Sequence, residues 1–243
     1  MKKRKTKFFL VSCAFLLLGI PEAVTAMGLR SFVALPINKG GVVLRQQFLS
    51  NPGTGSRHAV FNLSWGLTGR DSLLLGLPFR LAPSGPDRTG DLAFLYRRTL
   101  WQFDQSHATS RVALLAGGVL STDSTRDNAF QFGAVASFNR DRHSYDIDAL
   151  FQHGSGSRSD SGRYDFSWQY RLTPSVYPEW GFTQEWFSVL ELNGRWKQGQ
   201  SIDHQITAGL QWVHHNWVLE GGVIRTINNT RQTQYLLSTR FHF

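Results

Sequence analysis

His153 and Ser155 are the residues whose types and spacing come nearest to a catalytic pair. Side chains two positions apart on a strand share a face, where a histidine can take the serine proton and activate the hydroxyl. A nucleophile also needs an oriented base and oxyanion donors, Gly156 follows Ser155, and no acid or amide partner can be assigned from the sequence. The sequence therefore favours a flexible loop here, with nucleophilic catalysis as the alternative.

His214 and His215 are the other candidates for chemistry, as metal ligands. Adjacent residues of a strand point to opposite faces, so the two imidazoles are poorly placed to share one ion, and we expect a turn here. The sequence contains no phosphate-binding loop, zinc spacing or calcium loop. We therefore predict no catalytic residue, no metal site and no cofactor.

The composition limits the elements that could position such residues. Charged residues make up 18% of the 243-residue chain and aromatic residues 13%, with 23 Gly and a mean hydropathy of −0.25. The aromatic content excludes a disordered chain, and the single cysteine excludes a disulfide scaffold. The negative mean hydropathy excludes a bundle of membrane helices. A β-protein whose apolar residues alternate with polar ones remains.

Alternation is clearest over residues 163–172. Tyr164, Phe166 and Trp168 share one strand face, while Arg163 and Asp165 lie on the other. A transmembrane barrel strand needs about 9–11 residues, apolar outward and polar inward. Segments of this kind recur at 41–50, 57–66, 72–81, 89–101, 110–120, 127–139, 143–153, 163–172, 180–195, 203–212, 217–225 and 232–243. The sequence thus predicts an all-β, transmembrane, antiparallel up-and-down barrel of about twelve strands.

The polar faces of these segments carry many ionisable side chains. A soluble barrel also alternates, but it would have to bury an unusual load of tryptophan, whereas a membrane barrel places tryptophans at its lipid interfaces. We therefore expect the ionisable face to line a lumen. The candidate lumen-lining residues are Arg45, Arg80, Asp146, Asp148, Arg163, Asp165, Arg171, Glu185, Glu191, Arg195, Asp203 and Glu220.

Both ends of the sequence support export. Residues 1–26 combine a basic start, an apolar run over Phe8–Ile20 and small residues up to Ala26, which predicts a cleaved signal peptide and assigns 27–243 to the barrel. Removal leaves 217 residues with no cysteine, 21 basic and 16 acidic residues, and no basic cluster for nucleic acid. The chain ends on Phe243, with apolar side chains at alternate positions of the last strand, as in the assembly signal of bacterial outer-membrane barrels.

The stretch Trp65-Gly-Leu-Thr-Gly-Arg-Asp-Ser-Leu-Leu-Leu-Gly-Leu-Pro-Phe79 is followed by Gly90-Asp91-Leu92. This pattern resembles a family of outer-membrane proteins named as transporters of the phenol-degradation (MetA) pathway. The resemblance covers about residues 60–100 and the terminal strand. It implies a barrel and a channel for small or aromatic compounds. In the motif, we expect Gly66 and Gly69 to suit a tight periplasmic turn, and Pro78 to lie near the outer end of a strand.

We therefore expect a bacterial outer-membrane β-barrel, exported through the Sec pathway, that acts as a passive channel or transporter for small, aromatic or hydrophobic solutes. Two alternatives stay open at this point: an outer-membrane lipid hydrolase using His153 and Ser155, and a structural or surface-interaction barrel without a conduit. The expected partners are outer-membrane lipid, the barrel-assembly machinery during biogenesis and a small-molecule solute, with no nucleic acid.

The first prediction concerns the location and stability of the mature chain. We expect it to fractionate with outer membranes and to change its electrophoretic mobility on boiling, because the closed hydrogen-bond ladder of a barrel resists detergent until heated. Membrane fractionation followed by electrophoresis of boiled and unboiled samples measures both. Recovery of the mature chain as a soluble periplasmic protein would contradict the architecture.

Overall fold

A computed structural model describes residues 27–176, 184–228 and 231–243 of the chain, and these ranges form twelve strands and no helix. No helix in this part of the chain is long and apolar enough to cross a membrane. The predicted signal peptide and residues 180–183 of the predicted strand 180–195 lie outside the described residues. The strands are β1 (Val42–Asn51), β2 (Ser56–Gly66), β3 (Asp71–Ala82), β4 (Leu92–Gln105), β5 (Ala108–Leu120), β6 (Ala129–Arg140), β7 (His143–Gly154), β8 (Ser161–Thr173), β9 (Glu185–Lys197), β10 (Asp203–His214), β11 (Trp217–Thr226) and β12 (Thr233–His242).

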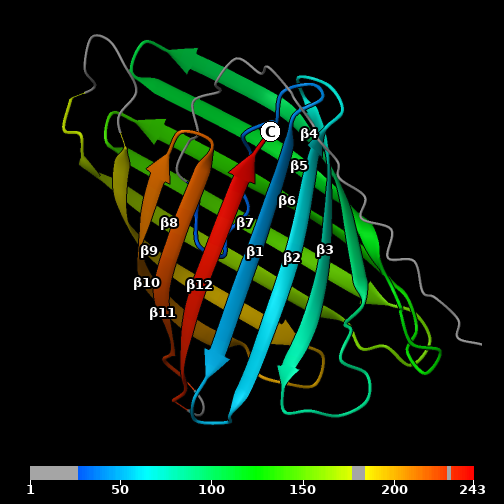
Figure 1. The fold of residues 1–243 in the computed structure, drawn as a ribbon. Helices are drawn as coiled ribbons and strands as arrows, with labels where there is room; N and C mark the ends of the chain where they lie inside the picture. Colours follow the sequence, from blue (N-terminus) through cyan, green and yellow to red (C-terminus); the bar gives the residue numbers. More distant parts are fainter. Residues whose placement is uncertain (1–26, 177–183, 229–230) are drawn as a thin grey trace, which may run out of the picture.

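The strands form one closed antiparallel barrel in which each strand pairs with its neighbours in sequence (Figure 1). The ring closes between β1 and β12, where Val43 lies opposite His242 and Ser50 lies opposite Tyr235. Closure leaves no unpaired edge strand, which is the condition for a β-structure to cross a bilayer. The predicted fold class and the predicted strand count are confirmed.

The side chains alternate between the two faces of the wall as the sequence predicts. On β8, Phe166 and Trp168 are exposed on the outer face, whereas Asp165 and Ser167 are buried inside. On β12, Tyr235, Leu237 and Phe241 are exposed, whereas Leu236, Ser238 and Arg240 are buried inside. An apolar outer face with a polar interior is the pattern of a barrel surrounded by lipid.

Strand β4 is longer than the predicted segment 89–101 because it contains a bulge. Its pairing with β5 shifts register between Thr99 and Trp101. Leu100 and Trp101 are therefore both exposed, although they are adjacent. A bulge interrupts strict alternation, so the predicted segment ends at this point while the strand continues to Gln105.

The barrel has two unlike rims. The C-terminal rim carries Phe243 and the tight turns before β3, β5, β7 and β11; two of these contain a residue with positive φ, Asp141 at 53° and His215 at 50°. The distal rim carries the longer connections 83–91, 121–128 and 155–160. His215 thus lies in a turn, as expected for the adjacent histidines.

Aromatic side chains gather on the outer face near the C-terminal rim. Trp186 stacks on Trp212 with ring centroids 5.9 Å apart, and Trp212 meets Trp217 edge-on at 4.8 Å. Trp168 stacks with His143 at 6.1 Å on the same rim. Amphipathic rings at this level match the interfacial belt of a membrane protein.

Gly66 has a different role from the one expected. Neither Gly66 nor Gly69 is among the residues with positive φ in the described ranges. A methyl group on Gly66 would lie 2.0 Å from the carbonyl oxygen of Asn38, so glycine is needed there for the close approach of the segment that precedes β1. The turn itself is held by Thr68, whose hydroxyl donates to Asp71 at 2.6 Å.

The second prediction tests the closing strand. Replacing both Phe241 and Phe243 with aspartate should sharply lower the amount of assembled protein, because both phenylalanines are exposed on the apolar outer face. A carboxylate near the membrane interface costs on the order of 1 kcal/mol, and the pair also removes the terminal aromatic pattern. The heat-modifiable band in outer membranes measures assembly.

Ile227→Asp is the matched control, because Ile227 is an equally exposed apolar residue in the connection after β11 rather than in a strand. Wild-type membrane levels of the Phe241→Asp/Phe243→Asp variant would show that the terminal motif has no part in assembly.

Candidate functional site in the lumen

The segment before β1 lies inside the barrel and not in its wall. We call residues 27–36 the luminal segment; in Figure 1 the blue chain ahead of β1 lies behind the front strands, within the ring. Leu29, Val33 and Ala34 are at most 1% exposed. This stretch belongs to the predicted barrel domain 27–243, and no separate role was expected for it. The feature of the sequence that could have indicated its position is an apolar run without strand alternation, which precedes the first predicted strand.

On one side of the lumen, carboxylates of the wall accept hydrogen bonds from backbone N–H groups of the luminal segment. The Glu191 carboxylate accepts from the backbone N–H of Arg30 at 3.1 Å and from the Ser31 hydroxyl at 3.3 Å. Asp148 accepts from the backbone N–H of Phe32 at 2.7 Å. Two adjacent N–H groups converging on one carboxylate resemble the nests that proteins use to bind anions, here with the anion supplied by the wall.

On another side of the lumen, arginine and glutamine side chains donate hydrogen bonds to backbone carbonyl groups of the luminal segment. The Arg45 guanidinium donates to the Leu29 carbonyl at 2.5 Å, and Gln47 donates to the same oxygen at 2.9 Å. Arg97 donates to the Val33 carbonyl at 2.6 Å. Because β1 and β7 lie six strands apart in the twelve-stranded ring, the acidic wall around Asp148 faces the basic wall around Arg45. The main chain of the luminal segment spans this gap.

Apolar contacts place the side chains of the luminal segment. Leu29 packs in a cluster with Val189, Ile224 and Leu236, all on the inner face of the wall. A methyl group on Gly209 or Gly222 would lie 2.7 or 3.0 Å from Leu29 Cδ1, so these two inward glycines leave the space for it.

A second apolar cluster lies further along the segment. Ala34 packs with Leu95, Leu115 and Leu150, and Phe32 packs against the same group. The Arg163 guanidinium lies over the Phe32 ring at 4.0 Å from its centroid. The lumen therefore holds two apolar seats, one for Leu29 and one for Phe32 and Ala34.

The predicted lumen-lining residues lie on the inner face, and several meet the luminal segment. Arg45, Asp148 and Glu191 bond it directly, and Arg163 covers Phe32. Asp146 lies beneath it, where it accepts from Ser137 at 2.5 Å, and the Ser137 hydroxyl in turn accepts from the backbone N–H of Ala34 at 2.8 Å.

The other predicted residues are held by neighbours in the wall. Glu220 is fully buried between Arg45 at 2.6 Å and Arg240 at 2.5 Å. The remaining contacts are Arg195–Asp165 at 2.8 Å, Arg171–Glu185 at 3.6 Å, Gln205 to Asp203 at 2.7 Å, and Arg80 to the Pro86 carbonyl at 2.5 Å. Arg80 is thus tied to the connection after β3, away from the luminal segment. Pairing offsets the cost of removing these charges from water.

Further arginines also lie in the lumen. Arg97 and Arg240 are buried on the inward parity of β4 and β12, as the alternation of these segments predicts. Arg30 belongs to the luminal segment and donates to Gln205 at 2.6 Å. No strand periodicity could have revealed Arg30, because the segment that carries it is not a strand.

His153 and Ser155 make separate contacts on the distal rim. The Ser155 hydroxyl donates to the Asn128 carbonyl at 2.8 Å. His153 Nδ1 lies 3.0 Å from an Asp160 carboxylate oxygen, and the ring is 67% exposed. The serine proton is therefore directed at a backbone carbonyl. Across the described ranges, no group of three or more histidine, cysteine or carboxylate side chains is arranged to hold a metal ion.

The same rim is held together by ion pairs between connections. Asp91 ahead of β4 pairs with Arg126 at 3.2 Å and with Arg158 at 2.8 Å. Asp127 accepts from the backbone N–H and the hydroxyl of Ser157, and these hydrogen bonds hold the pKa of the Asp127 carboxyl below its usual value. The connections 83–91, 121–128 and 155–160 thus form one linked group at the distal mouth.

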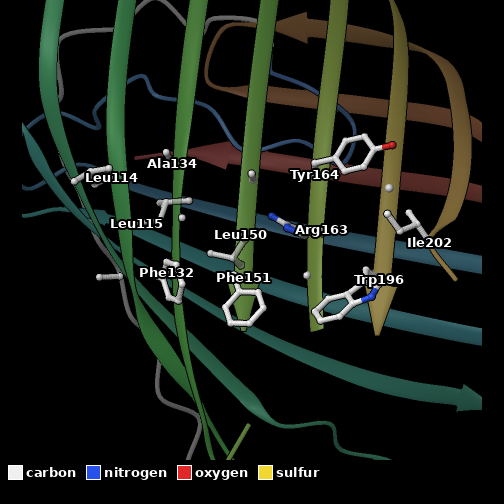
Figure 2. A pocket seen from close by; sticks show the side chains of 15 residues that line it. Leu114, Leu115, Phe132, Ala134, Leu150, Phe151, Arg163, Tyr164, Trp196 and Ile202 are labelled. Carbon is white, nitrogen blue, oxygen red and sulfur yellow. The ribbon is translucent and has the colours of Figure 1, made fainter. Parts of the chain in front are cut away.

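An apolar depression of about 690 Å³ also marks the outer face of β5 to β9 (Figure 2). Phe132, Phe151 and Trp196 surround it, and Ala134 and Ala149 contribute small side chains. Its outward residues face the lipid side of the wall, so we expect bilayer acyl chains to fill it. The polar chemistry of the molecule is confined to the lumen and the rims.

Comparisons with solved structures identify the architecture. KdgM porin in complex with disordered oligogalacturonate matches with a TM-score of 0.53 and 12% identity, covering 84% of this chain and 99% of the porin. A second KdgM porin structure gives a TM-score of 0.51 with the same identity and coverage. The chain folds as an outer-membrane β-barrel. No family model and no curated protein matches the sequence.

The third prediction tests whether polar contacts hold the luminal segment in the barrel. A cysteine replacing the buried Val33 should react slowly with a membrane-impermeant maleimide, and replacing Asp148 and Glu191 together with alanine should accelerate labelling severalfold. The chain's one native cysteine, Cys13, lies in the predicted signal peptide, so labelling reports the new thiol.

The control variant carries Asp148→Asn and Glu191→Gln, which keep an acceptor oxygen at each site, and it should label nearly as slowly as the parent. Rapid labelling of Val33→Cys in the otherwise native barrel would show that the segment does not stay in the lumen.

Proposed function

We propose that the protein is a passive outer-membrane channel for small solutes whose lumen is closed by its own residues 27–36. The observation that supports this most directly is a closed twelve-stranded wall with a charged interior that binds a non-wall segment through side chains. A barrel of this size lies between eight-stranded barrels, which side chains fill, and 16–18-stranded porins, which hold an aqueous channel. Withdrawal of the segment would leave a narrow polar conduit.

The charge distribution favours solutes with polar groups. The carboxylates of β7 to β9 lie among Arg163, Arg171 and Arg195, while Arg45, Arg97 and Arg240 lie on β1, β4 and β12. Arg163 approaches Asp148 and Asp165 only to 3.9 Å, beyond hydrogen-bond distance, so its charge is paired with them less closely than Arg195 is with Asp165 at 2.8 Å. Such opposed rings of charge set the selectivity of narrow pores.

Two likenesses bear on the solute. The resemblance of residues 60–100 to transporters of the phenol-degradation pathway suggests aromatic compounds, and one KdgM porin structure is described as a complex with oligogalacturonate. Both suggest small organic solutes, and the inner wall of this barrel suits those that carry hydrogen-bonding groups.

The remaining parts of the proposal concern export and activity. We propose export through the Sec pathway with removal of residues 1–26, followed by insertion into outer-membrane lipid by the barrel-assembly machinery. We further propose a non-enzymatic role, which the separate contacts of His153 and Ser155 support.

The fourth prediction follows from the closed lumen. Deleting residues 27–35, with the signal peptide joined to Pro36, should raise single-channel conductance in planar bilayers well above that of the intact barrel, since the lumen loses its occupant. Residues 36–41 are retained because the Gly40 N–H donates to the Gly66 carbonyl and supports the C-terminal rim.

Ser155→Ala in the intact barrel is the control and should leave conductance unchanged, because Ser155 bonds a backbone carbonyl on the distal rim. A heat-modifiable deletion variant that conducts no better than the intact barrel would overturn the channel proposal. Phospholipid release abolished by Ser155→Ala would establish the hydrolase instead.

A further inference from the structure

We propose that the lumen is a binding site for short peptides, occupied here by the chain's own luminal segment and able to take a separate peptide when that segment is withdrawn. This inference deepens the proposed function by naming peptides as the solute class. It rests on how the wall holds residues 28–34, through main-chain recognition combined with two apolar seats.

Side chains of the wall hydrogen-bond to the main chain of the luminal segment. Three consecutive N–H groups, those of Arg30, Ser31 and Phe32, donate to wall carboxylates, and the carbonyls of Leu29 and Val33 accept from wall arginines. Every peptide carries these N–H and carbonyl groups at the same spacing, whatever its side chains. Aromatic hydrocarbons and simple ions do not carry them.

Three of the wall groups that meet the luminal segment, Arg45, Ser137 and Arg97, are also held by partners in the wall. Arg45 is also paired with Glu220 at 2.6 Å, and Ser137 also donates to Asp146 at 2.5 Å. Arg97 also donates to Ser72 at 3.1 Å. Side chains that are already held by wall partners form a preorganised site, which lowers the entropic cost of binding a second peptide.

The two apolar seats add side-chain selectivity. Leu29 enters the seat formed by Val189, Ile224 and Leu236, and Phe32 packs against the cluster around Leu95. The seats are three residues apart along the bound chain. We therefore expect preference for peptides with an apolar residue at one position and an aromatic or apolar residue three positions later.

The experiment uses the barrel lacking residues 27–35 and a synthetic peptide with the sequence of residues 27–36, Met-Gly-Leu-Arg-Ser-Phe-Val-Ala-Leu-Pro, carrying a fluorophore at its C-terminus. We expect saturable binding by fluorescence anisotropy and a concentration-dependent block of current through the deleted barrel. The intact barrel should bind at least about tenfold more weakly, because its site is already filled.

Two altered peptides separate the two modes of recognition. N-methylation at Arg30 removes an N–H group that donates to Glu191, and N-methylation at Phe32 removes the one that donates to Asp148. Together they should weaken binding by about tenfold or more. Replacing Leu29 and Phe32 with serine should weaken it comparably by emptying the apolar seats. A peptide that keeps both residues in place but carries alanine at the half-buried Leu35 is the control and should bind almost as well.

Equal binding to the intact and the deleted barrel, equal binding of the N-methylated peptide, or the absence of saturable binding would each overturn the inference. The outcomes distinguish it from the channel proposal. A deleted barrel that conducts but is not blocked by the peptide contradicts only the peptide site. A deleted barrel that binds the peptide but does not conduct contradicts only the channel.

Discussion

The rest of the structure depends on the closure of the backbone hydrogen-bond ladder between β1 and β12. In lipid no water can bond to exposed peptide groups, so every strand must find partners on both sides. Closure of the ring meets this requirement and, because successive side chains point to opposite faces, it also divides the chain into a lipid-facing set and an enclosed set. The aromatic belt near the C-terminal rim and the enclosed charges are both consequences of that division.

The enclosed charges in turn need partners. Glu220 lies between Arg45 and Arg240, and Asp165 pairs with Arg195, so part of the interior is neutralised within the wall. Asp148 and Glu191 are instead satisfied largely by N–H groups of the luminal segment. The segment that fills the lumen is thus also part of its electrostatic balance, and its removal would expose charged groups that water or a polar solute can then contact.

This arrangement relates closure of the conduit to selectivity. Main-chain hydrogen bonds and two apolar seats hold the luminal segment inside the lumen, and the chain continues from it into β1. The same groups that hold it are the ones that a passing solute would meet. Under the proposed channel function, such a barrel would favour solutes that resemble its own occupant over those that are merely small enough to pass.

The sequence by itself determined the wall. Alternating residues such as Phe166 and Asp165 place their own side chains on opposite faces because strand geometry has a period of two, so the strand count, the inner face and the turn at His215 followed from local pattern. The β4 bulge and the close approach at Gly66 depend on pairing between segments and were visible only in three dimensions. The position of residues 27–36 was also decided by tertiary structure alone, since its hydrogen bonds join Arg30 to Glu191 and Phe32 to Asp148, more than a hundred residues apart. No local periodicity encodes such contacts, because they exist only after the ring has closed around the segment.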